Sequence, residues 1–511
     1  MNIIIDRASP IPIYLQIKQQ IRDRIVTGLL PPGYRLPPER KLAERLDLNR
    51  STVLNAYHEL KAAGLVESFV GRGTIVLDTE ETDEGAGEVT DSASAPASLY
   101  WKPMLTAKAA AESSSLIRDL LALPKRQDAV SFGVGVPLPE PELLEELQQM
   151  AGRLFTEDGG EVMLHSPVEG RASLRQALCD RMRDRGIRCS KEEVIVLSGA
   201  QQGLDLIART LLSPGDCVLA EEPTYFSALQ TFRAAGATVI GVPVDEDGRL
   251  RLDAMESLLR SYRPKFIYVI PSYQNPSGRL MDTSVRESLL HLAYRYRTPI
   301  VEEDPYGELA YGEKSPLPIK AMDEHAHVLY IGTFSKLLGP GMRIGWIAAP
   351  KPILKVMGRM KQLNDLHTNS VAQKLLEAAL REGAVDRHLA RIRTLYRARR
   401  DEMCDALKRY AVPGMQWDVP MGGLFLWLRL PGCVNVQELA VRAADRGVDY
   451  IPGAPFFAEQ PKGSYIRLNF ARADIERIGE GIRRLCAAVE DATEGPEVTG
   501  EREQEGTIPI V

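Results

Sequence analysis

Six short apolar runs recur between residues 105 and 488, and stretches of helical spacing separate them. The runs are "EEVIVLSG", "DCVLAEE", "ATVIGVPV", "KFIYVIPS", "TPIVEED" and "HVLYIGTF". Between them lie stretches such as "GLDLIARTLL" and "SVRESLLHLAYRYR", whose apolar residues repeat with the period of a helix. Strands that alternate with helices pair in parallel, because each helix carries the chain back across the sheet. The pattern predicts an α/β domain with a mostly parallel sheet flanked by helices.

Two acidic segments with few apolar residues divide the 511-residue chain, which is too long for a single core. Residues 79–98, "TEETDEGAGEVTDSASAPAS", contain six acids and no base, and residues 489–511 contain seven acids and one arginine. Such segments bury too little surface to offset their conformational entropy. We therefore predict four parts: a module over 1–78, a flexible acidic linker over 79–104, a large domain over 105–488 and a disordered acidic tail over 489–511.

The cysteines and the N-terminal residues indicate the cellular compartment in which we expect the protein. Six cysteines are scattered without a CxxC motif or paired spacing, which indicates reduced thiols and predicts no metal site. The N-terminus "MNIIIDRASP" has no long apolar core, and no apolar run approaches membrane-spanning length. We expect a cytoplasmic protein without a membrane contact.

The first 78 residues have the pattern of a small helical module with a hairpin. In "PIYLQIKQQIRDRIVTGLL", Tyr14, Ile17, Ile21 and Ile25 share one helical face. The next segment, "ERKLAERLDLNRSTVLNAYHELKAAG", predicts two short helices joined by a tight turn, the second beginning after a capping Asn49. "LVESFVGRGTIVL" then predicts a hairpin with glycines at its tip. The order predicts a winged helix-turn-helix.

In a helix-turn-helix, the start of the second helix lies in the major groove of DNA. This places Arg50, Ser51 and Thr52 near bases or phosphates. Further candidate contacts are Arg35, Arg40, Arg45 and Arg72. For any single arginine, an ordinary surface position is an equal alternative.

The stretch "YRLPPERKLAERLDLNRSTVLNAYHEL…GRGT" resembles the winged helix-turn-helix of the GntR family of bacterial regulators. It departs from the family pattern at Pro38 and Asn49, where serine is common. The resemblance implies binding to double-stranded DNA through Arg35, Arg50 and the wing residues Arg72 and Gly73.

A lysine in "GTFSKLLGPGMRIGW" raises the question of covalent chemistry. Lys336 stands seven residues before Arg343. A desolvated lysine near cations loses its proton more readily and becomes a nucleophile towards aldehydes, of which pyridoxal 5′-phosphate (PLP) is the commonest cofactor. A PLP site also needs a carboxylate for the pyridine nitrogen, donors to the 3′ oxygen, a phosphate site and a stacking ring. The candidates, in that order, are Asp304; Asn275 and Tyr306; Gly199, Ala200, Gln201, Ser335 and Arg343; and Tyr225.

Each candidate alone has a plain structural alternative. Asp304 could cap a strand end, Asn275 could serve a turn, and Gly199 could mark a common glycine turn before a helix. The five features occurring together, in a plausible order, favour a PLP site.

Residues 105–488 resemble the class I and II aminotransferases of PLP fold type I. The resemblance implies a smaller C-terminal α/β subdomain, an internal aldimine at Lys336, and catalytic roles for Lys336, Asp304 and Tyr225. In "YIRLNFA", it assigns Arg467 to the substrate α-carboxylate. An exposed strand arginine is the alternative, which the apolar neighbours of Arg467 disfavour.

Two positions depart from related proteins. His165 begins the "HSPVEGRASLR" motif where a tyrosine is frequent, and Ser227 stands where γ-aminobutyrate sensors of the GabR type carry an arginine. We therefore do not expect γ-aminobutyrate as the ligand, and the roles of both residues stay open.

The order of module, linker and large domain resembles the MocR/GabR regulators over nearly the whole chain. The resemblance implies a homodimer, and transcription regulation in which an amine or amino acid forms an external aldimine at Lys336 and changes DNA binding. The alternative is a catalytically active aminotransferase that carries a DNA-binding module. The residues for transamination are present, so the sequence does not decide whether the chain turns substrate over, nor does it identify the effector, the operator or the sign of regulation.

Overall fold

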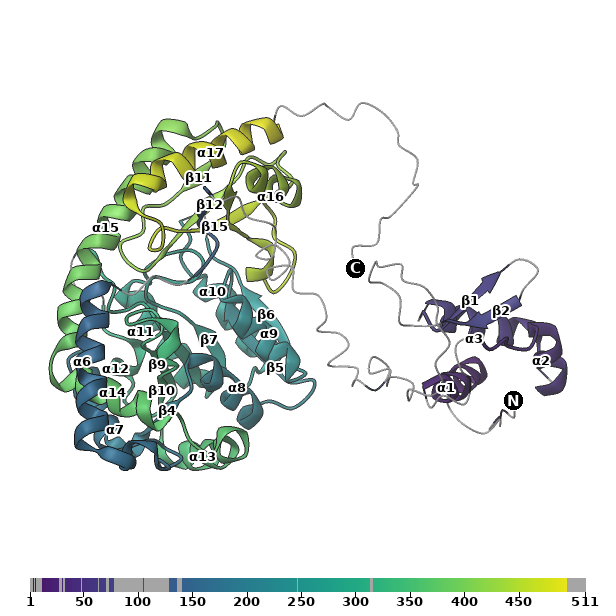
Figure 1. Cartoon of the computed structure of the whole chain (residues 1–511), viewed down its shortest axis with the longest axis horizontal. Helices are drawn as coiled ribbons and strands as arrows, with labels where there is room; N and C mark the ends of the chain where they lie inside the picture. The colour runs from purple at the N-terminus through teal and green to yellow at the C-terminus, as the bar shows by residue number, and fades with distance from the viewer. Residues whose placement is uncertain are drawn as a thin grey trace. The chain divides into compact units, whose positions relative to one another are not determined.

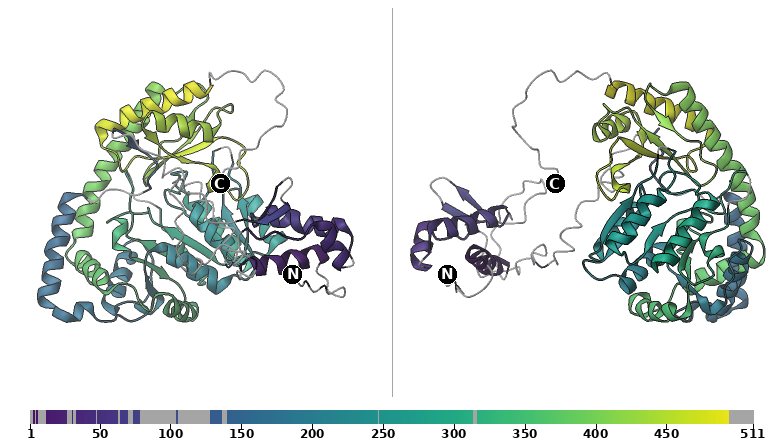
Figure 2. Two further views of the ribbon diagram at one scale, coloured as in Figure 1. Left: turned by 45° about the vertical axis from the view of Figure 1, so that its right-hand side comes forward. Right: turned by 180° about the vertical axis from the view of Figure 1, so that it is seen from behind.

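The computed structural model describes residues 3, 5, 12–26, 30, 33–46, 48–62, 64–69, 73–77, 104, 128–135, 140–245, 247–312 and 316–493. They fall into two compact units, Met1–Ser114 and Ser115–Val511 (Figures 1 and 2). The linker predicted over residues 79–104 lies outside the described residues except for Met104. Among the described helices, none combines the length and apolarity needed to cross a bilayer.

The described residues of the N-terminal unit form three helices and a two-stranded antiparallel hairpin, as predicted. The elements are α1 (Ile13–Val26), α2 (Glu39–Leu46), α3 (Arg50–Ala62), β1 (Val66–Phe69) and β2 (Gly73–Val76). Its core includes the fully buried Ile17, Ile21, Leu42, Val53 and Leu60, so the predicted apolar face of α1 packs with residues of α2 and α3 in one core. The cap predicted for the third helix is present, since the Asn49 side chain accepts the Ser51 N–H at 3.3 Å.

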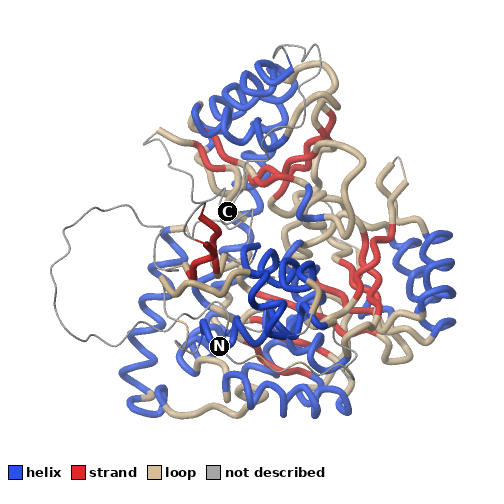
Figure 3. The backbone as a smooth tube through the Cα atoms, turned by 90° about the vertical axis from the view of Figure 1, so that its right-hand side faces the viewer, coloured by secondary structure: helices blue, strands red, loops and turns tan. Residues whose placement is uncertain are grey.

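The large unit is built on a seven-stranded sheet of order β4-β10-β9-β8-β7-β5-β6. Figure 3 draws the strands of the chain in red. All neighbours are parallel except β10, which is antiparallel to both β4 and β9. The strands are β4 (Val194–Leu197), β5 (Cys217–Glu221), β6 (Thr238–Val242), β7 (Ile267–Val269), β8 (Ile300–Asp304), β9 (Val328–Thr333) and β10 (Gly345–Ala348). Six of these coincide with the predicted runs, and β10 is an addition to them.

Helices cover both faces of this sheet (Figure 1). Those before and between the strands are α6 (Pro141–Glu157), η2 (Gly159–Met163), α7 (Ala172–Arg183), η3 (Lys191–Glu193), α8 (Ala200–Leu211), α9 (Phe226–Ala234), α10 (Leu252–Tyr262), α11 (Thr283–Tyr296), α12 (Ile319–Met322) and η4 (Pro340–Met342). Those that follow β10 are α13 (Lys351–Asp365), α14 (Ser370–Arg381) and α15 (Ala384–Tyr410).

Strand residues alternate between two hydrophobic clusters, one on each face. Ile267 and Ile300 pack in the cluster that contains α10, α11 and α12, whereas Tyr268 and Val301 pack in the cluster that contains α8 and α9. This follows from the two-residue period of a strand. Consecutive residues at the end of β8 therefore belong to different faces of the sheet.

The smaller subdomain at the C-terminal end has an antiparallel sheet of order β11-β12-β15-β14 and a parallel β13–β3 pair. Its elements are β3 (Val130–Ser131), β11 (Gln416–Trp417), β12 (Phe425–Arg429), α16 (Val436–Asp445), β13 (Val448–Asp449), β14 (Ile451–Pro452), η5 (Ala454–Phe456), β15 (Tyr465–Asn469) and α17 (Ile475–Thr493). Helix α17 continues to Thr493, past the predicted start of the acidic tail, because Val489 is buried on its apolar face. The rest of that segment lies outside the described residues.

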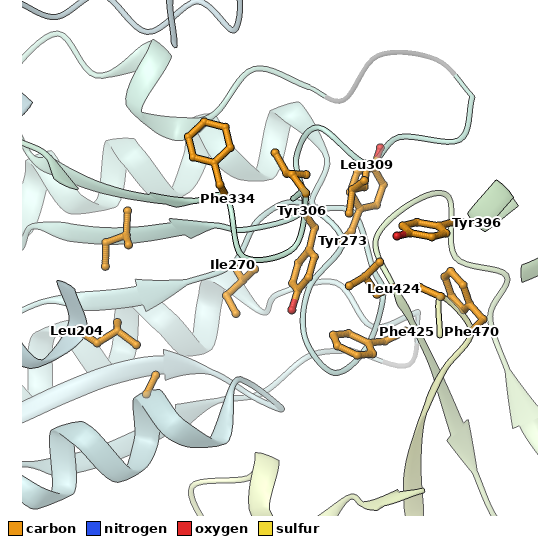
Figure 4. Packing of buried hydrophobic residues seen from close by; sticks show 14 of the residues in the cluster. Leu204, Ile270, Tyr273, Tyr306, Leu309, Phe334, Tyr396, Leu424, Phe425 and Phe470 are labelled. Atoms are coloured by element: carbon orange, nitrogen blue, oxygen red, sulfur yellow. The ribbon is translucent and has the colours of Figure 1, made fainter. Parts of the chain in front are cut away.

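The subdomain meets the large sheet through aromatic side chains (Figure 4). Tyr306, which follows β8, packs edge-to-face against Phe425 of β12, with ring centroids 5.7 Å apart. Tyr396 of α15 and Phe470, after β15, belong to the same buried cluster. This junction places β12 and β15 beside the carboxyl ends of the parallel strands, where ligands bind in open α/β sheets.

Candidate PLP and DNA-binding sites

A cavity of about 290 Å³ lies at the carboxyl ends of the parallel strands. It brings together residues that are far apart in the sequence, from α8 to η4. It is lined by Ala200, Gln201, Tyr225, Ile270, Asn275, Glu303, Pro305, Tyr306, Thr333, Ser335, Lys336, Pro340 and Arg343. Most of the predicted cofactor residues thus share one cavity, and Gly199 directly precedes Ala200.

Lys336 follows β9 and points its amine at the backbone, with Nζ donating to the Gly135 carbonyl at 2.7 Å. Burial lowers the pKa of Lys336 to about 8, helped by the charges of Arg467 and Arg343 and opposed by Glu303. A lysine with this pKa has a larger neutral, nucleophilic fraction near neutral pH than an ordinary lysine.

The Lys336 amine is therefore expected to gain reactivity towards aldehydes as the pH rises through about 8, because deprotonation of the ammonium exposes the nitrogen lone pair. Reductive methylation by formaldehyde, quantified at Lys336 by peptide mass spectrometry, measures this in the cofactor-free protein. A midpoint at the ordinary lysine value near 10.4 would contradict the effect of burial.

The candidate phosphate site lies where α8 begins. Gly199, the N-cap of α8, has φ +91°, and a side chain there would collide with the Arg343 guanidinium. Arg343 also donates from Nη2 to the Ser198 carbonyl at 3.0 Å. Ala200 and Gln201 occupy the first turn, where free N–H groups and the helix dipole attract anions. Ser335, buried beside Lys336, completes this end of the cavity.

Asn275, Tyr306 and Tyr225 lie on the other walls of the cavity. Burial raises the pKa of Tyr306, with Arg467 and Asn275 acting in the opposite direction. Burial likewise raises the pKa of Tyr225, which Ser227 opposes through a hydrogen bond. Both phenols therefore stay protonated at neutral pH and keep an O–H group to donate.

Arg467 is a buried cation on β15. Its Nη1 donates to Asn275 Oδ1 at 3.0 Å and its Nη2 to the Gly133 carbonyl at 3.2 Å. Its guanidinium carbon lies 4.1 Å from the Phe425 ring centroid. No carboxylate of the described residues pairs with it, Nε has no partner, and burial lowers its pKa to about 10. A buried cation without an acid partner is costly, so the arrangement suits an anionic ligand group beside Arg467.

Asp304, predicted to meet the pyridine nitrogen, does not line the cavity. Its carboxylate pairs with Arg185 and accepts the Tyr330 hydroxyl at 3.0 Å. The alternation of residues along β8 places Asp304 on the same face as Glu302, and it places Glu303 in the cavity. Glu303 was not among the predicted site residues, since "EED" does not state which acid faces inward.

The residues present fit PLP. The lysine with a lowered pKa, the candidate phosphate site at the start of α8 and the phenols that line the cavity are groups that the cofactor requires. Lys336 would hold its aldehyde carbon, and Ser335, Arg343 and the first turn of α8 would hold its phosphate. When bound, PLP supplies an electron sink for bonds at the α-carbon of an amine.

In the N-terminal unit, Arg40 lies on α2 and Arg50, Ser51 and Thr52 begin α3, whereas Arg35 and Gly73 lie at the hairpin. Arg40, Arg50 and Ser51 are exposed, whereas Thr52 is half-buried. Arg50 Nη2 lies 3.3 Å from Glu39 Oε2 in an exposed ion pair. The Arg35 guanidinium packs against Gly73, whose φ is +83° and where a Cβ would approach Arg35 Nε to 2.8 Å. Arg72 lies outside the described residues.

His165 contacts another histidine, with its Nδ1 2.9 Å from His367 Nε2. This contact joins the segment before α7 to the segment before α14. His165 is exposed, and it does not line the cavity described above.

The fold and these sites define a PLP-binding protein of the aminotransferase fold that also carries a winged helix-turn-helix. Comparison with known proteins agrees: the model of the family "Aminotransferase class I and II" matches residues 127–485, and that of "Bacterial regulatory proteins, gntR family" matches residues 13–76.

Relatives match either the large unit or the whole chain. An "Aromatic-amino-acid aminotransferase 1" of Thermococcus litoralis is 37% identical over 77% of this chain and 95% of its own length. An "Uncharacterized HTH-type transcriptional regulator YdfD" of Bacillus subtilis is 32% identical over 95% of this chain and 98% of its own. Among solved structures, the α-aminoadipate aminotransferase LysN of Thermus thermophilus, complexed with N-(5′-phosphopyridoxyl)-L-leucine, is 36% identical with a TM-score of 0.71, covering 77% of this chain and 99% of that one.

The chain belongs to the aminotransferase class I and II family, and its gntR module gives it the architecture of the MocR/GabR-type regulators. PLP is the cofactor that this family and the PLP-derived ligand of LysN indicate.

Proposed function

We propose that this chain is a transcriptional regulator that binds double-stranded DNA through its gntR module and senses an amine or amino acid at the PLP site. The observation that carries the proposal is the buried Arg467, which has no acid partner among the described residues and contacts Asn275 of the cavity. A carboxylate ligand would supply the missing charge, so we infer an amino acid as the effector class. Lys336, Arg343 and the start of α8 would hold the cofactor beside it.

A second candidate is a working aminotransferase that carries a DNA-binding module. The presence of Lys336, Tyr225, Asn275 and Arg467 around one cavity favours it, because these groups serve turnover as well as sensing. The identity to an aromatic-amino-acid aminotransferase and to LysN points the same way.

One experiment separates the two candidates. The PLP-loaded full chain is titrated with a panel of amino acids and amines, with 2-oxoglutarate present or absent, while the cofactor spectrum and binding to its own upstream DNA are followed. A spectral change that alters DNA binding without product accumulation supports the sensor. Rapid multiple turnover without any change in DNA binding would contradict it.

Arg50→Ala is expected to weaken binding to that DNA by about 5- to 150-fold, because an arginine at the start of the recognition helix contributes roughly 1–3 kcal/mol. The matched control is Lys61→Ala, which removes an exposed cation from the last turn of the same helix. Filter binding or fluorescence anisotropy at several salt concentrations measures the difference. Equal losses in the two variants would reject Arg50 as a DNA contact.

We further propose that two copies associate through the large unit. Exposed apolar side chains gather on two segments that the His165–His367 contact brings together. They are Met163, Leu164, Leu363 and Leu366, with exposed fractions of 70%, 63%, 84% and 58%. Covering such side chains is favourable. We expect sedimentation equilibrium to give twice the chain mass for the full-length protein; the mass of one chain at micromolar concentration would refute the dimer.

A further inference from the structure

We propose that Glu303, held by Tyr268, is the carboxylate that meets the ring nitrogen of PLP in this chain, and that Asp304 is a structural residue on the other face of the sheet. This deepens the proposed site and rests on PLP binding at Lys336. The inference follows from three consecutive acids at the end of β8, Glu302, Glu303 and Asp304, each of which has a different environment.

Glu302 and Asp304 point to the same face of the sheet and are already engaged there. Glu302 accepts the N–H groups of Ile319 and Lys320 at 2.9 and 2.8 Å, at the start of α12. Both carboxylates are buried, and neither lines the cavity that contains Lys336. Glu302 therefore holds the start of α12, and neither acid faces Lys336.

Asp304 has its hydrogen-bonding capacity filled. Its Oδ2 pairs with Arg185 and accepts the Tyr330 hydroxyl at 3.0 Å, while its Oδ1 accepts the Gly307 N–H at 2.9 Å. The side chain is 1% exposed, and a Cβ on Gly307 would collide with both Asp304 and Arg185. The arginine neutralises the carboxylate, so Asp304 has little left to offer a cationic ring nitrogen.

Glu303 has the opposite properties. It lines the cavity with Lys336 and is 5% exposed. Tyr268 donates its hydroxyl to Oε2 at 2.5 Å, and Oε1 accepts no hydrogen bond from the described residues. Burial and the neighbouring Glu303 charge raise the pKa of Tyr268 well above 10, so the phenol remains a donor that fixes the carboxylate.

A buried acid without an arginine needs a positive partner. Burial raises the pKa of Glu303 to about 7, while Tyr268 and the charge of Lys336 lower it. A protonated pyridine nitrogen supplies the positive charge, and the carboxylate in turn keeps that nitrogen protonated. Each group thus stabilises the charged form of the other, which Asp304 in its pair with Arg185 cannot do.

The test is ¹⁵N NMR of the full chain reconstituted with PLP labelled at the ring nitrogen, for the wild type, Glu303→Gln and Asp304→Asn. We expect a protonated-nitrogen shift in the wild type, its loss in Glu303→Gln, and its retention in Asp304→Asn. The dissociation constant for PLP, from absorbance titration, should rise about tenfold in Glu303→Gln, since a charge-assisted hydrogen bond is lost.

Two further variants keep the result interpretable. Glu303→Asp retains a carboxylate and should restore the protonated shift at least in part, and Tyr268→Phe should weaken it without removing it. Asp304→Asn should lower the thermal unfolding midpoint, because it leaves Arg185 buried without its partner. An unprotonated nitrogen in the wild type, or loss of protonation in Asp304→Asn but not in Glu303→Gln, would overturn the inference. If the wild type does not bind PLP, the proposed PLP site itself is wrong, and this inference, which rests on it, is wrong as well.

Discussion

Lys336→Ala is expected to abolish the covalent retention of PLP and, with it, the change in DNA binding on addition of an amino acid. Among the described residues that line the cavity, Lys336 is the single lysine, so no second amine can take its place. Its lowered pKa is a property of the site, set by burial and by Arg467 and Arg343. Borohydride reduction followed by mass spectrometry of the intact chain measures the covalent cofactor, and anisotropy measures DNA binding.

The matched control for this experiment is Lys355→Ala, an exposed lysine on α13. It should keep both the reduced cofactor mass and the response. Lys336→Arg adds a second comparison, because it retains a positive charge without a nucleophilic amine. An effector response that survives in Lys336→Ala would show that sensing does not use this lysine.

Much of the fold could be predicted because its strands are short apolar runs bounded by polar turns. Strand β10 is the strand of the large sheet that the sequence pattern did not predict. It follows the glycine-rich stretch around Gly339 and Gly341, which predicts a turn. Its partner β9 directly precedes that stretch, but its other partner, β4, is far away in sequence. Its antiparallel pairing between them is set by tertiary contacts, which no local pattern encodes.

Site residues could be predicted from the sequence where only one residue type can perform the chemistry. They could not be predicted where neighbouring residues of the same type differ only in the direction in which the fold points them. Lys336, Arg343 and the Gly199 turn stand out by type and spacing. The choice between Glu303 and Asp304 depends on which face of β8 is inward, and a shift of one residue reverses that choice. The contact between Arg467 and Asn275 joins residues 192 positions apart, so only the folded chain reveals it.

The second large effect is expected at Arg467. Arg467→Leu should lower the affinity for amino-acid effectors by about 30-fold or more, since removing one partner of a buried charge pair costs at least about 2 kcal/mol. Amines that lack a carboxylate should bind about as before. Spectral titration of the PLP-loaded variant with an amino acid and its decarboxylated amine measures the two affinities side by side.

Two further consequences distinguish loss of a ligand contact from damage to the fold. Leucine in place of an unpaired buried cation removes a desolvated charge, so the unfolding temperature should not fall greatly. The pKa of Lys336 should rise, because Arg467 is one of the charges that lower it, and the midpoint of the methylation profile would move to higher pH. If amino acids and amines lose affinity equally, Arg467 acts through Asn275 and the cofactor rather than on the ligand carboxylate, and the inference that the effector is an amino acid loses its support.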